Sequence, residues 1–451
     1  MHQPNEFLRK TLHIAFGLFA VTLRWLPWWA AAGVAAGAVA GNWLVLHRIV
    51  GRGVSRHERG WDAGIVLYPF AVAVLIVVFR DRLALAAIAW VVLAFGDGFA
   101  TVVGKTFRGP ALPWNGEKSW SGFLAFVTAG TFGGLAIAIW MQHAINPIHV
   151  VIVVVVAAVV ESLPLRVNDN VTVPAAAAVT LLVLAPAPWH PYELPAHAVS
   201  WLAVNTLLAA AGWLARSVNL SGAAGGWVLG AIIILAAGWP MYVALLAFFV
   251  IGTGATKLGY RRKAAAGLAQ EEGGRRGFRH AFSNAGVAAI CAIAFSRYAR
   301  SLSPLDLAPI LYLMGIASLA TAAADTTASE VGQLAGRRAF LPLTFRRVSP
   351  GTEGAISVEG TLAGLVAGLG VAVAGSFSFQ MMSGWDVQRV WTAAALITAA
   401  AFLGSYIESV AGSWNRERAE PVPNGVLNFF NTAAGAILFY WLARWMWPIA
   451  I

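Results

Sequence analysis

Residues 150–160 read VVIVVVVAAVV, an apolar run that contains no polar side chain and ends directly before Glu161. Comparable runs recur at residues 66–79, 242–251 and 393–403, separated by polar segments. A helix that crosses a bilayer needs roughly 20 mostly apolar residues, and somewhat fewer when flanking side chains reach the interface. The pattern predicts an all-α protein that forms a polytopic bundle of transmembrane helices.

The composition of the whole chain also indicates a membrane environment. Of its 451 residues, 59% are hydrophobic and 11% are charged, against roughly 45–50% and about 25% in soluble domains. This composition excludes an ordinary water-soluble domain. The net charge is +11, but the basic residues are scattered among loops. We therefore attribute the charge to membrane topology and expect no nucleic-acid partner.

We expect about 15 membrane spans, with boundaries uncertain by about four residues. They lie at residues 11–23, 28–47, 61–79, 83–103, 121–141, 146–161, 173–188, 199–215, 218–237, 240–256, 283–298, 307–325, 356–376, 388–411 and 426–446. If the N-terminus is cytoplasmic, 24 of the 31 Lys and Arg residues fall in cytoplasmic loops. This bias predicts a cytoplasmic N-terminus and an external C-terminus, and the expected location is a bacterial inner membrane.

A proline-rich segment at residues 185–195 divides the chain roughly into halves. We interpret residues 1–190 as one membrane domain, residues 191–215 as a linker with a connecting helix, and residues 216–451 as a second membrane domain. The first apolar stretch lacks a small-residue cleavage site, so we expect no removable signal peptide.

Residues suited to phosphate and metal binding gather at the cytoplasmic end of the fourth span. Asp97 ends an apolar helix, where a carboxylate is costly unless it pairs or binds a cation. Gly104, Lys105 and Lys118 follow, and Ser119 opens the next span. Glycines let backbone amides approach phosphate oxygens, lysines neutralise those oxygens, and a carboxylate can hold Mg²⁺. The plainer interpretations are an ion pair for Asp97, an interface anchor for Lys105 and an N-cap for Ser119.

Other polar residues share the expected membrane depth of Asp97. Glu161 ends the sixth span, and the Asn-Asp-Asn turn at residues 168–170 follows it. The carboxylate and this amide-rich turn could complete a metal or headgroup site. The turn has a simpler interpretation as solvated turn chemistry. Arg9, Lys10 and His13 lie at the cytoplasmic end of the first span. A histidine that enters a membrane segment is expected to have a polar partner.

The second half repeats the order of these residues. In both halves an Asp-x-x-Ala-x-x-x-Gly segment ends a span, a glycine-containing segment follows, and a Glu-Ser pair and asparagines come later. The carboxylates share one expected side of the membrane, so these are parallel repeats, unlike the inverted repeats of many transporters. The repeated positions are Arg279, His280, Asn284, Asp325, Ala328, Gly332, Thr352, Gly354, Gly360, Glu408, Ser409, Asn424, Asn428 and Asn431.

A basic, glycine-containing loop runs from Lys257 to Gly277. One interpretation is an electrostatic anchor on anionic lipid. The other is a phosphate-binding loop for a substrate that already carries a phosphate.

These motifs resemble two known families. Residues 1–190 resemble the dolichol kinase and phytol kinase family in an Arg-Lys-x-x-His segment from Arg9, an Asp-Gly-x-Ala-x-x-x-Gly-Lys segment from Asp97, and a Glu-Lys-Ser-x-x-Gly segment from Glu117. Ser121 departs from this pattern, because many members have an acidic residue there. Residues from about 215 onward are similar to the family that contains plant phytyl-phosphate kinase. The matching positions are Ser221, Gly222, Ala223, Asn284, Gly286 and residues 254–257, 325–332 and 352–364.

The resemblance implies a fusion of two successive isoprenoid kinases that convert a prenol, such as phytol or geranylgeraniol, to its monophosphate and then to its diphosphate. The implied phosphate donor is CTP or another nucleoside triphosphate, and the cofactor is Mg²⁺ or another divalent cation. The partners are the membrane-embedded isoprenoid alcohol and its phosphate, the nucleotide and the lipid bilayer, with active sites on the cytoplasmic face.

Each candidate residue receives an expected role on this basis. Asp97, Glu161, Asp325 and Glu408 are expected to be catalytic and to hold the metal, and His13 to act as base or orienting group for the prenol hydroxyl. The expected nucleotide-binding or phosphate-binding residues are Arg9, Lys10, Gly104, Lys105, Lys118, Ser119, Lys257, Arg279, Asn284, Gly332, Thr352, Gly354 and Asn428.

Two other functions are compatible with the residues. A cytidylyltransferase that acts on a lipid phosphate would use similar embedded acidic and glycine-rich sites, but would release pyrophosphate instead of CDP. A membrane transporter would place carboxylates at mid-membrane depth or facing both sides. The carboxylates of this sequence instead cluster at one expected face.

Overall fold

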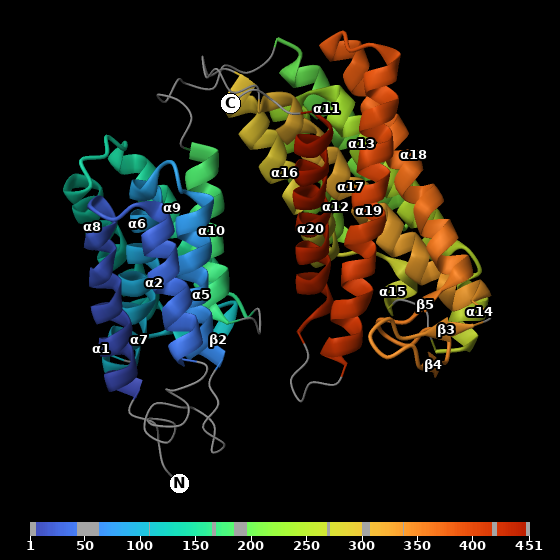
Figure 1. Cartoon of the computed structure of the whole chain (residues 1–451). Coiled ribbons are helices and arrows are strands. Elements are labelled where there is room, and N and C mark those ends of the chain that lie inside the picture. Colours follow the sequence, from blue (N-terminus) through green and yellow to red (C-terminus); the bar gives the residue numbers. More distant parts are fainter. Residues whose placement is uncertain are drawn as a thin grey trace. The chain divides into compact units, whose positions relative to one another are not determined.

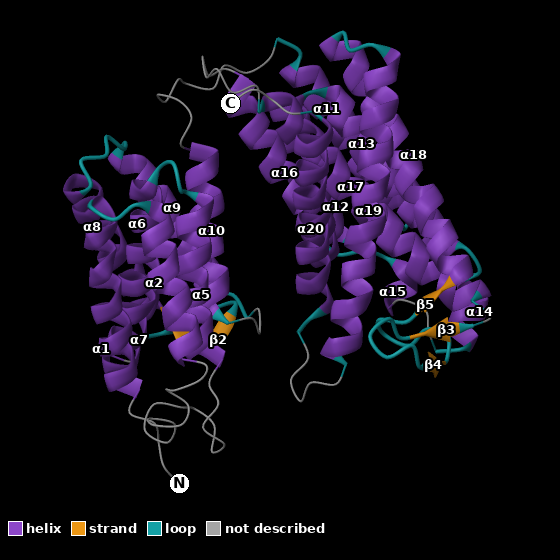
Figure 2. Cartoon of the chain, in the orientation of Figure 1, coloured by secondary structure: helices purple, strands orange, loops and turns teal. Residues whose placement is uncertain are grey.

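The computed structural model describes residues 6–42, 63–107, 109–164, 168–184, 196–267, 271–299, 307–336, 338–416 and 422–447. The chain forms two compact units, residues 1–185 and residues 186–451. Each unit is a bundle of helices (Figure 1), to which short strands are added (Figure 2). The prediction of an all-α membrane fold is confirmed.

The first unit is built around α6 (Leu83–Val91), of whose nine residues seven are buried. It continues through the π-helical turn η3 (Val92–Asp97) into α7 (Gly98–Phe107). A π-helical turn widens a helix locally and is frequent at functional sites. The other elements are α1 (Glu6–Gly17), η1 (Leu18–Arg24), α2 (Trp28–Gly41), α5 (Ala63–Val78), β1 (Ala111–Leu112), β2 (Asn115–Ser119), α8 (Trp120–Trp140), α9 (Pro147–Ser162) and α10 (Asp169–Leu184).

The second unit is built around α17 (Ala308–Ala335), which packs against six other helices of the unit. Sixteen of its 28 residues are buried, and most are alanine or other small residues that allow close approach. The other elements are α11 (Ala198–Leu214), α12 (Leu220–Ala237), α13 (Trp239–Lys257), α14 (Tyr260–Ala265), α15 (Glu271–Gly274), α16 (Phe278–Ala299), β3 (Ala339–Phe340), β4 (Arg347–Val348), β5 (Ile356–Ser357), α18 (Val358–Ser383), α19 (Val387–Asn415) and α20 (Asn424–Met446).

The repeat expected from the sequence has a structural counterpart in each unit. The central helix leads to a short antiparallel sheet, β1-β2 in one unit and β4-β3-β5 in the other, and then to a long helix. Ser119 and Ser357 cap these helices, and each accepts the backbone N–H of the glycine three residues later at 3.2 Å. A Cβ on Gly104 would lie 3.2 Å from Ser119 Oγ, and a Cβ on Gly332 would lie 3.3 Å from Ser357 Oγ. The two central helices therefore pack on the next helix in the same way.

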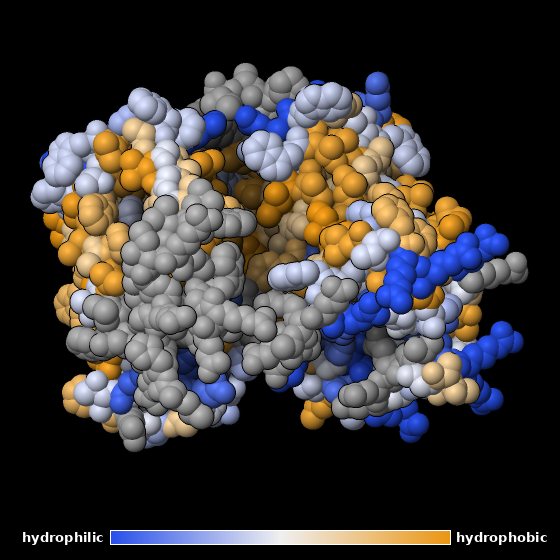
Figure 3. All heavy atoms as spheres, turned by 60° about the horizontal axis from the view of Figure 1, so that its bottom comes forward, coloured by the Kyte–Doolittle hydropathy of each residue, from blue (hydrophilic) through white to orange (hydrophobic). Residues whose placement is uncertain are grey.

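Hydrophobic side chains also cover the outside of the described helices. Phe132 and Val199 are 75% and 83% exposed, as expected for lipid-facing positions. Figure 3 shows hydrophobic residues over much of the visible surface, with hydrophilic residues mainly in the lower half of the view and a smaller group at its top. Within the described residues, nine helices are long and apolar enough to span a membrane, and five shorter apolar helices have 10–17 residues. The predicted count of about 15 spans is not confirmed by these helices.

The contact between α12 and the segment before α16 yields a test of the packing. A Cβ on Gly222 would lie 2.0 Å from the carbonyl oxygen of Arg276, whereas Gly226, one turn later, has open space around it. We expect Gly222→Ala to lower the free energy of unfolding by about 1–3 kcal/mol. Gly226→Ala, the matched control, should be neutral or slightly stabilising because alanine favours helix.

Thermal unfolding in detergent can be followed with a thiol-reactive dye, because Cys291 is buried in the folded protein. It is also the single cysteine of the chain. Equal unfolding midpoints for the two variants would contradict the close contact at Gly222.

Candidate functional site

Asp97 forms the centre of a buried charged group in the first unit. Its side chain is 3% exposed, and its Oδ2 accepts a hydrogen bond from Lys10 Nζ at 2.6 Å. His13 Nε2 lies 3.5 Å from the same oxygen. The first helix thus supplies these two neighbours of the carboxylate. Asp97 ends η3, but the helix continues through α7 to Phe107. The prediction that Asp97 ends its helix is therefore wrong.

Lys118 connects two further carboxylates to this group. It forms an ion pair with Glu161 at the end of α9, and its Nζ lies 3.5 Å from Asp169 Oδ2 at the start of α10. Burial opposes the charge of Lys118, but Glu161 and Asp169 outweigh burial and raise the pKa of Lys118 above its usual value. The lysine is therefore cationic at neutral pH.

The loop that carries Lys118 is held against the end of α9. Trp114 Nε1 donates to Ser162 Oγ and Asn115 Nδ2 donates to the Ser162 carbonyl, both at 3.0 Å. These bonds fix β2 beside Glu161. They explain how a lysine on a strand reaches a carboxylate on a helix 43 residues later.

Three carboxylates of the first unit are close enough to share a cation. One oxygen from each of Asp97, Glu161 and Asp169 lies within 4.8 Å of the others. Mg²⁺ prefers oxygen ligands of this kind, so the residues fit a divalent cation. Asp169 is not among the site residues named from the sequence, where the Asn-Asp-Asn turn had two interpretations, part of a metal or headgroup site and a solvated turn. Its position in the first turn of an apolar helix was the available signal.

His13 is held in place by an aromatic neighbour. Its ring lies 4.3 Å from the ring of Tyr68, measured between centroids. The Tyr68 hydroxyl donates to the His13 carbonyl at 3.3 Å and accepts from Trp90 Nε1 at 2.9 Å. The histidine of the predicted site therefore has the polar surroundings that its membrane location requires.

The other predicted residues of the first unit differ in their placement. Lys105 is exposed on α7, eight residues beyond Asp97 and thus about 12 Å farther along the helix axis. Gly104 and Ser119 take part in the packing of α7 on α8. The side chain of Arg9 lies outside the described residues.

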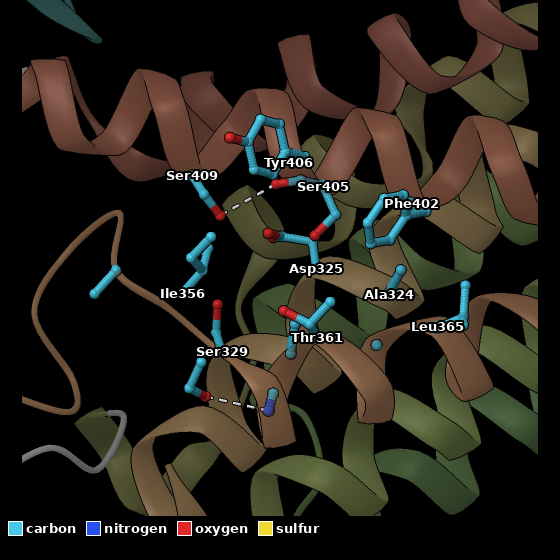
Figure 4. A pocket seen from close by; sticks show the side chains of 15 residues that line it. Ala324, Asp325, Ser329, Ile356, Thr361, Leu365, Phe402, Ser405, Tyr406 and Ser409 are labelled. Atoms are coloured by element: carbon cyan, nitrogen blue, oxygen red, sulfur yellow. Dashed lines mark hydrogen bonds between the residues drawn. The ribbon is translucent and has the colours of Figure 1, made fainter. Parts of the chain in front are cut away.

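The second unit has a carboxyl pair in the corresponding place. The carboxyl groups of Asp325 on α17 and Glu408 on α19 are within hydrogen-bonding reach of each other, and Glu353 adds a further negative charge near Glu408. Asp325 lines a pocket with about 510 Å³ of space that protein atoms do not fill, part of it open to solvent. Figure 4 shows Asp325 with Thr361 and the hydroxyl-bearing residues of α19 around this pocket.

The two carboxylate sites differ in their charge balance. Among the described residues, no Lys, Arg or His forms an ion pair with Asp325 or Glu408. In the first unit Lys10 forms an ion pair with Asp97, and Lys118 forms one with Glu161. The sequence repeat therefore preserves the carboxylates and changes their cationic neighbours.

The basic loop of the second unit is partly turned inward. Lys263 is buried and forms an ion pair with Glu330, while Arg276 donates to Thr256 Oγ1 at 2.9 Å. Lys257 donates to the Ala215 carbonyl and to Ser217 Oγ, both at 3.1 Å. Several of these cations thus hold the loop to the helices.

The remaining predicted residues of the second unit have mixed surroundings. Arg279 is exposed, and neither it nor Lys257 lines the pocket at Asp325. Asn428 is half-buried on α20. Their predicted phosphate contacts stay predictions.

Four more of these residues have structural contacts. Asn284 Nδ2 donates to the His280 carbonyl at 2.8 Å, and Thr352 Oγ1 donates to the Ser349 carbonyl at 2.7 Å. Gly332 packs on Ser357. Gly354 has a φ of +72°, and a Cβ there would lie 2.1 Å from the backbone nitrogen of Ser413. This position requires glycine for the loop to approach α19.

Comparison with known proteins places this architecture in a family. Residues 203–428 match the family described as Integral membrane protein DUF92. The chain belongs to this family.

Three relatives illustrate the range of similar proteins. An uncharacterized membrane protein of Synechocystis sp. is 40% identical over 212 residues, which are 47% of this chain and 77% of the relative. Protein VTE6, chloroplastic, of Arabidopsis thaliana is 33% identical over 227 residues, 50% of this chain and 65% of the relative. Phytol kinase 1, chloroplastic, of the same plant is 30% identical over 138 residues, 28% of this chain and 45% of the relative. No solved structure matches the chain.

The DUF92 match covers only one of the two carboxylate sites. The matched residues 203–428 include Asp325 and Glu408. Asp97, Glu161 and Asp169 lie before the matched range. The second-unit pocket is thus the site that lies within the family match.

Proposed function

We propose that this DUF92 member is an isoprenoid-lipid kinase with two successive activities. The first unit phosphorylates a membrane-embedded prenol to its monophosphate, and the second unit phosphorylates the monophosphate to the diphosphate. The observation that carries the proposal is the recurrence of buried carboxylates at the same point of a repeated helix, sheet and helix arrangement. The similarity to phytol kinase 1 supports the reaction class.

A divalent cation, with Mg²⁺ as the first candidate, is the cofactor of this proposal. Asp97, Glu161 and Asp169 would hold it in the first unit, and Asp325 and Glu408 in the second. When bound, Mg²⁺ supplies charge neutralisation of the nucleotide phosphates. Lys10 and Lys118 would contact the phosphate oxygens of CTP or another nucleoside triphosphate.

The first step transfers the γ-phosphoryl group to an alcohol. The prenol oxygen attacks the γ-phosphorus, the bond from this phosphorus to the β–γ bridging oxygen breaks, and the nucleoside diphosphate leaves. The His13 imidazole accepts the proton of the prenol hydroxyl, while its Nε2 faces two acceptor oxygens, the Leu93 carbonyl and Asp97 Oδ2. Asp97, 3.5 Å from this nitrogen, favours the protonated imidazole by its negative charge.

The second step needs no such base. A prenyl monophosphate is largely ionised at neutral pH, because the second pKa of a phosphate monoester is about 6. Its oxygen can attack the γ-phosphorus without losing a proton. No histidine is among the described residues that line the pocket at Asp325, which agrees with a phosphate nucleophile.

Incubation of the detergent-purified protein with nucleotides labelled at the γ-phosphate, together with phytol or geranylgeraniol, tests the proposal. We expect label in a lipid monophosphate and then in a diphosphate. No labelled lipid across a panel of nucleotides and prenols would overturn the kinase proposal. Release of pyrophosphate, with the nucleotide base retained on the lipid, would instead identify a cytidylyltransferase.

A further inference from the structure

Asn431 on α20 is a buried amide whose hydrogen-bonding groups are not used. It is 3% exposed, and within the described structure neither its Oδ1 nor its Nδ2 has a hydrogen-bond partner. A buried polar group without a partner costs free energy, so such a group calls for an explanation. A bound ligand that supplies the missing partner is one such explanation.

The position of Asn431 follows from a close contact of three helices. A Cβ on Gly404 of α19 would lie 2.8 Å from Thr321 Cγ2 on α17 and 3.2 Å from Gly435 Cα on α20. A Cβ on Gly435 would lie 2.0 Å from Thr321 Oγ1. These three residues therefore mark one level at which α17, α19 and α20 meet.

One helical turn from this level lie the residues of the carboxyl site. Asp325 and Glu408 each follow their contact residue by four positions, and Asn431 precedes Gly435 by four. Residues four apart lie on the same face of a helix. Asn415 at the end of α19 bonds to Val422 just before α20 at 2.6 and 2.9 Å, so these two helices run in opposite directions. The spacing therefore places the three residues on the same side of the contact, one helical turn away from it.

We propose that Asn431 completes a divalent-cation site with Asp325 and Glu408, and that this site binds its cation without nucleotide. Two carboxylates and an amide oxygen are the ligand types that Mg²⁺ and Mn²⁺ accept. The facing carboxyl groups of Asp325 and Glu408 form no ion pair with a described side chain, so a cation relieves their repulsion. This inference deepens the proposed function and rests on it.

The first unit differs in the order of binding. Lys10 and Lys118 already neutralise Asp97 and Glu161. A cation is held there only after nucleotide phosphates draw the lysines away from the carboxylates. The two sites of one chain therefore differ in whether the cation binds before the nucleotide.

Titration of the full chain in detergent with Mn²⁺ alone, followed by electron paramagnetic resonance of the free ion, tests the inference. We expect one bound Mn²⁺ per chain in the wild type and in Asp97→Asn. Asn431→Leu should weaken binding roughly 10–100-fold, the range found when groups that support a metal site are lost. Asn431→Asp should bind Mn²⁺ at least as tightly as the wild type, because it supplies a charged oxygen of the same size.

Wild-type affinity in Asn431→Leu, or weakened binding in Asn431→Asp, would overturn the inference. A second Mn²⁺ that is lost in Asp97→Asn would overturn the proposed order of binding. Kinase activity without nucleotide-independent Mn²⁺ binding would remove the inference and leave the proposed function. Mn²⁺ binding without any kinase activity would remove the proposed function and leave the cation site.

Discussion

Asp97→Asn is expected to stop the formation of prenyl monophosphate from prenol, with a loss of roughly 10²–10³-fold in rate, as when one group that stabilises developing charge is removed. Asp97 is the carboxylate that meets Lys10, His13, Glu161 and Asp169 in the first unit. The amide of asparagine has nearly the same shape as the carboxylate of Asp97 but carries no charge. The measurement is the rate of appearance of labelled monophosphate, resolved from diphosphate by thin-layer chromatography.

The same variant contains its own control. When prenyl monophosphate is supplied, Asp97→Asn should still form the diphosphate, because the second unit is unchanged. Asp97→Asn also leaves Lys10 buried without its counterion, which costs about 3–5 kcal/mol. The double variant Asp97→Asn, Lys10→Met removes this cation and should recover stability without recovering the first step. Equal loss of both steps would contradict independent sites.

The sequence allowed part of this site to be predicted because its pattern has a local physical meaning. Small residues three and seven positions after Asp97 and Asp325 lie on one helix face, and this face packs on the capped start of the next helix. A Cβ on Gly122 would lie 2.9 Å from the Ala100 carbonyl oxygen, and one on Gly360 would lie 2.6 Å from that of Ala328. The repeated spacing therefore predicted repeated packing.

Contacts between residues that are far apart in the sequence could not be predicted from it. Lys10 and Asp97 are 87 residues apart, and only the packing of α1 beside η3 brings them together. The sequence left the turn at Asp169 open between a solvated turn and part of a metal or headgroup site, because the nearness of Asp169 to Glu161 depends on how α9 and α10 meet. Lys263 is one of many basic residues in its loop, and no local pattern marks it as the partner of Glu330 on a different helix.

Asp325→Asn is expected to let prenyl monophosphate accumulate from prenol while diphosphate formation falls by roughly 10²–10³-fold. The substitution leaves the first unit intact and removes one charge from the carboxyl pair with Glu408. The ratio of labelled monophosphate to diphosphate at fixed prenol turnover is the measurement. Diphosphate formation at the wild-type rate would show that Asp325 does not carry the second step.

Glu330→Gln is the matched control for this prediction, because Glu330 is another buried carboxylate of α17 that does not line the pocket at Asp325. It leaves Lys263 buried without its ion-pair partner, so it should lower the thermal midpoint at least as much as Asp325→Asn does. The ratio of monophosphate to diphosphate should nevertheless stay at the wild-type value. If destabilisation of the second unit alone caused the block, both variants would accumulate monophosphate. Accumulation in Asp325→Asn alone would therefore assign the effect to the carboxyl pair itself.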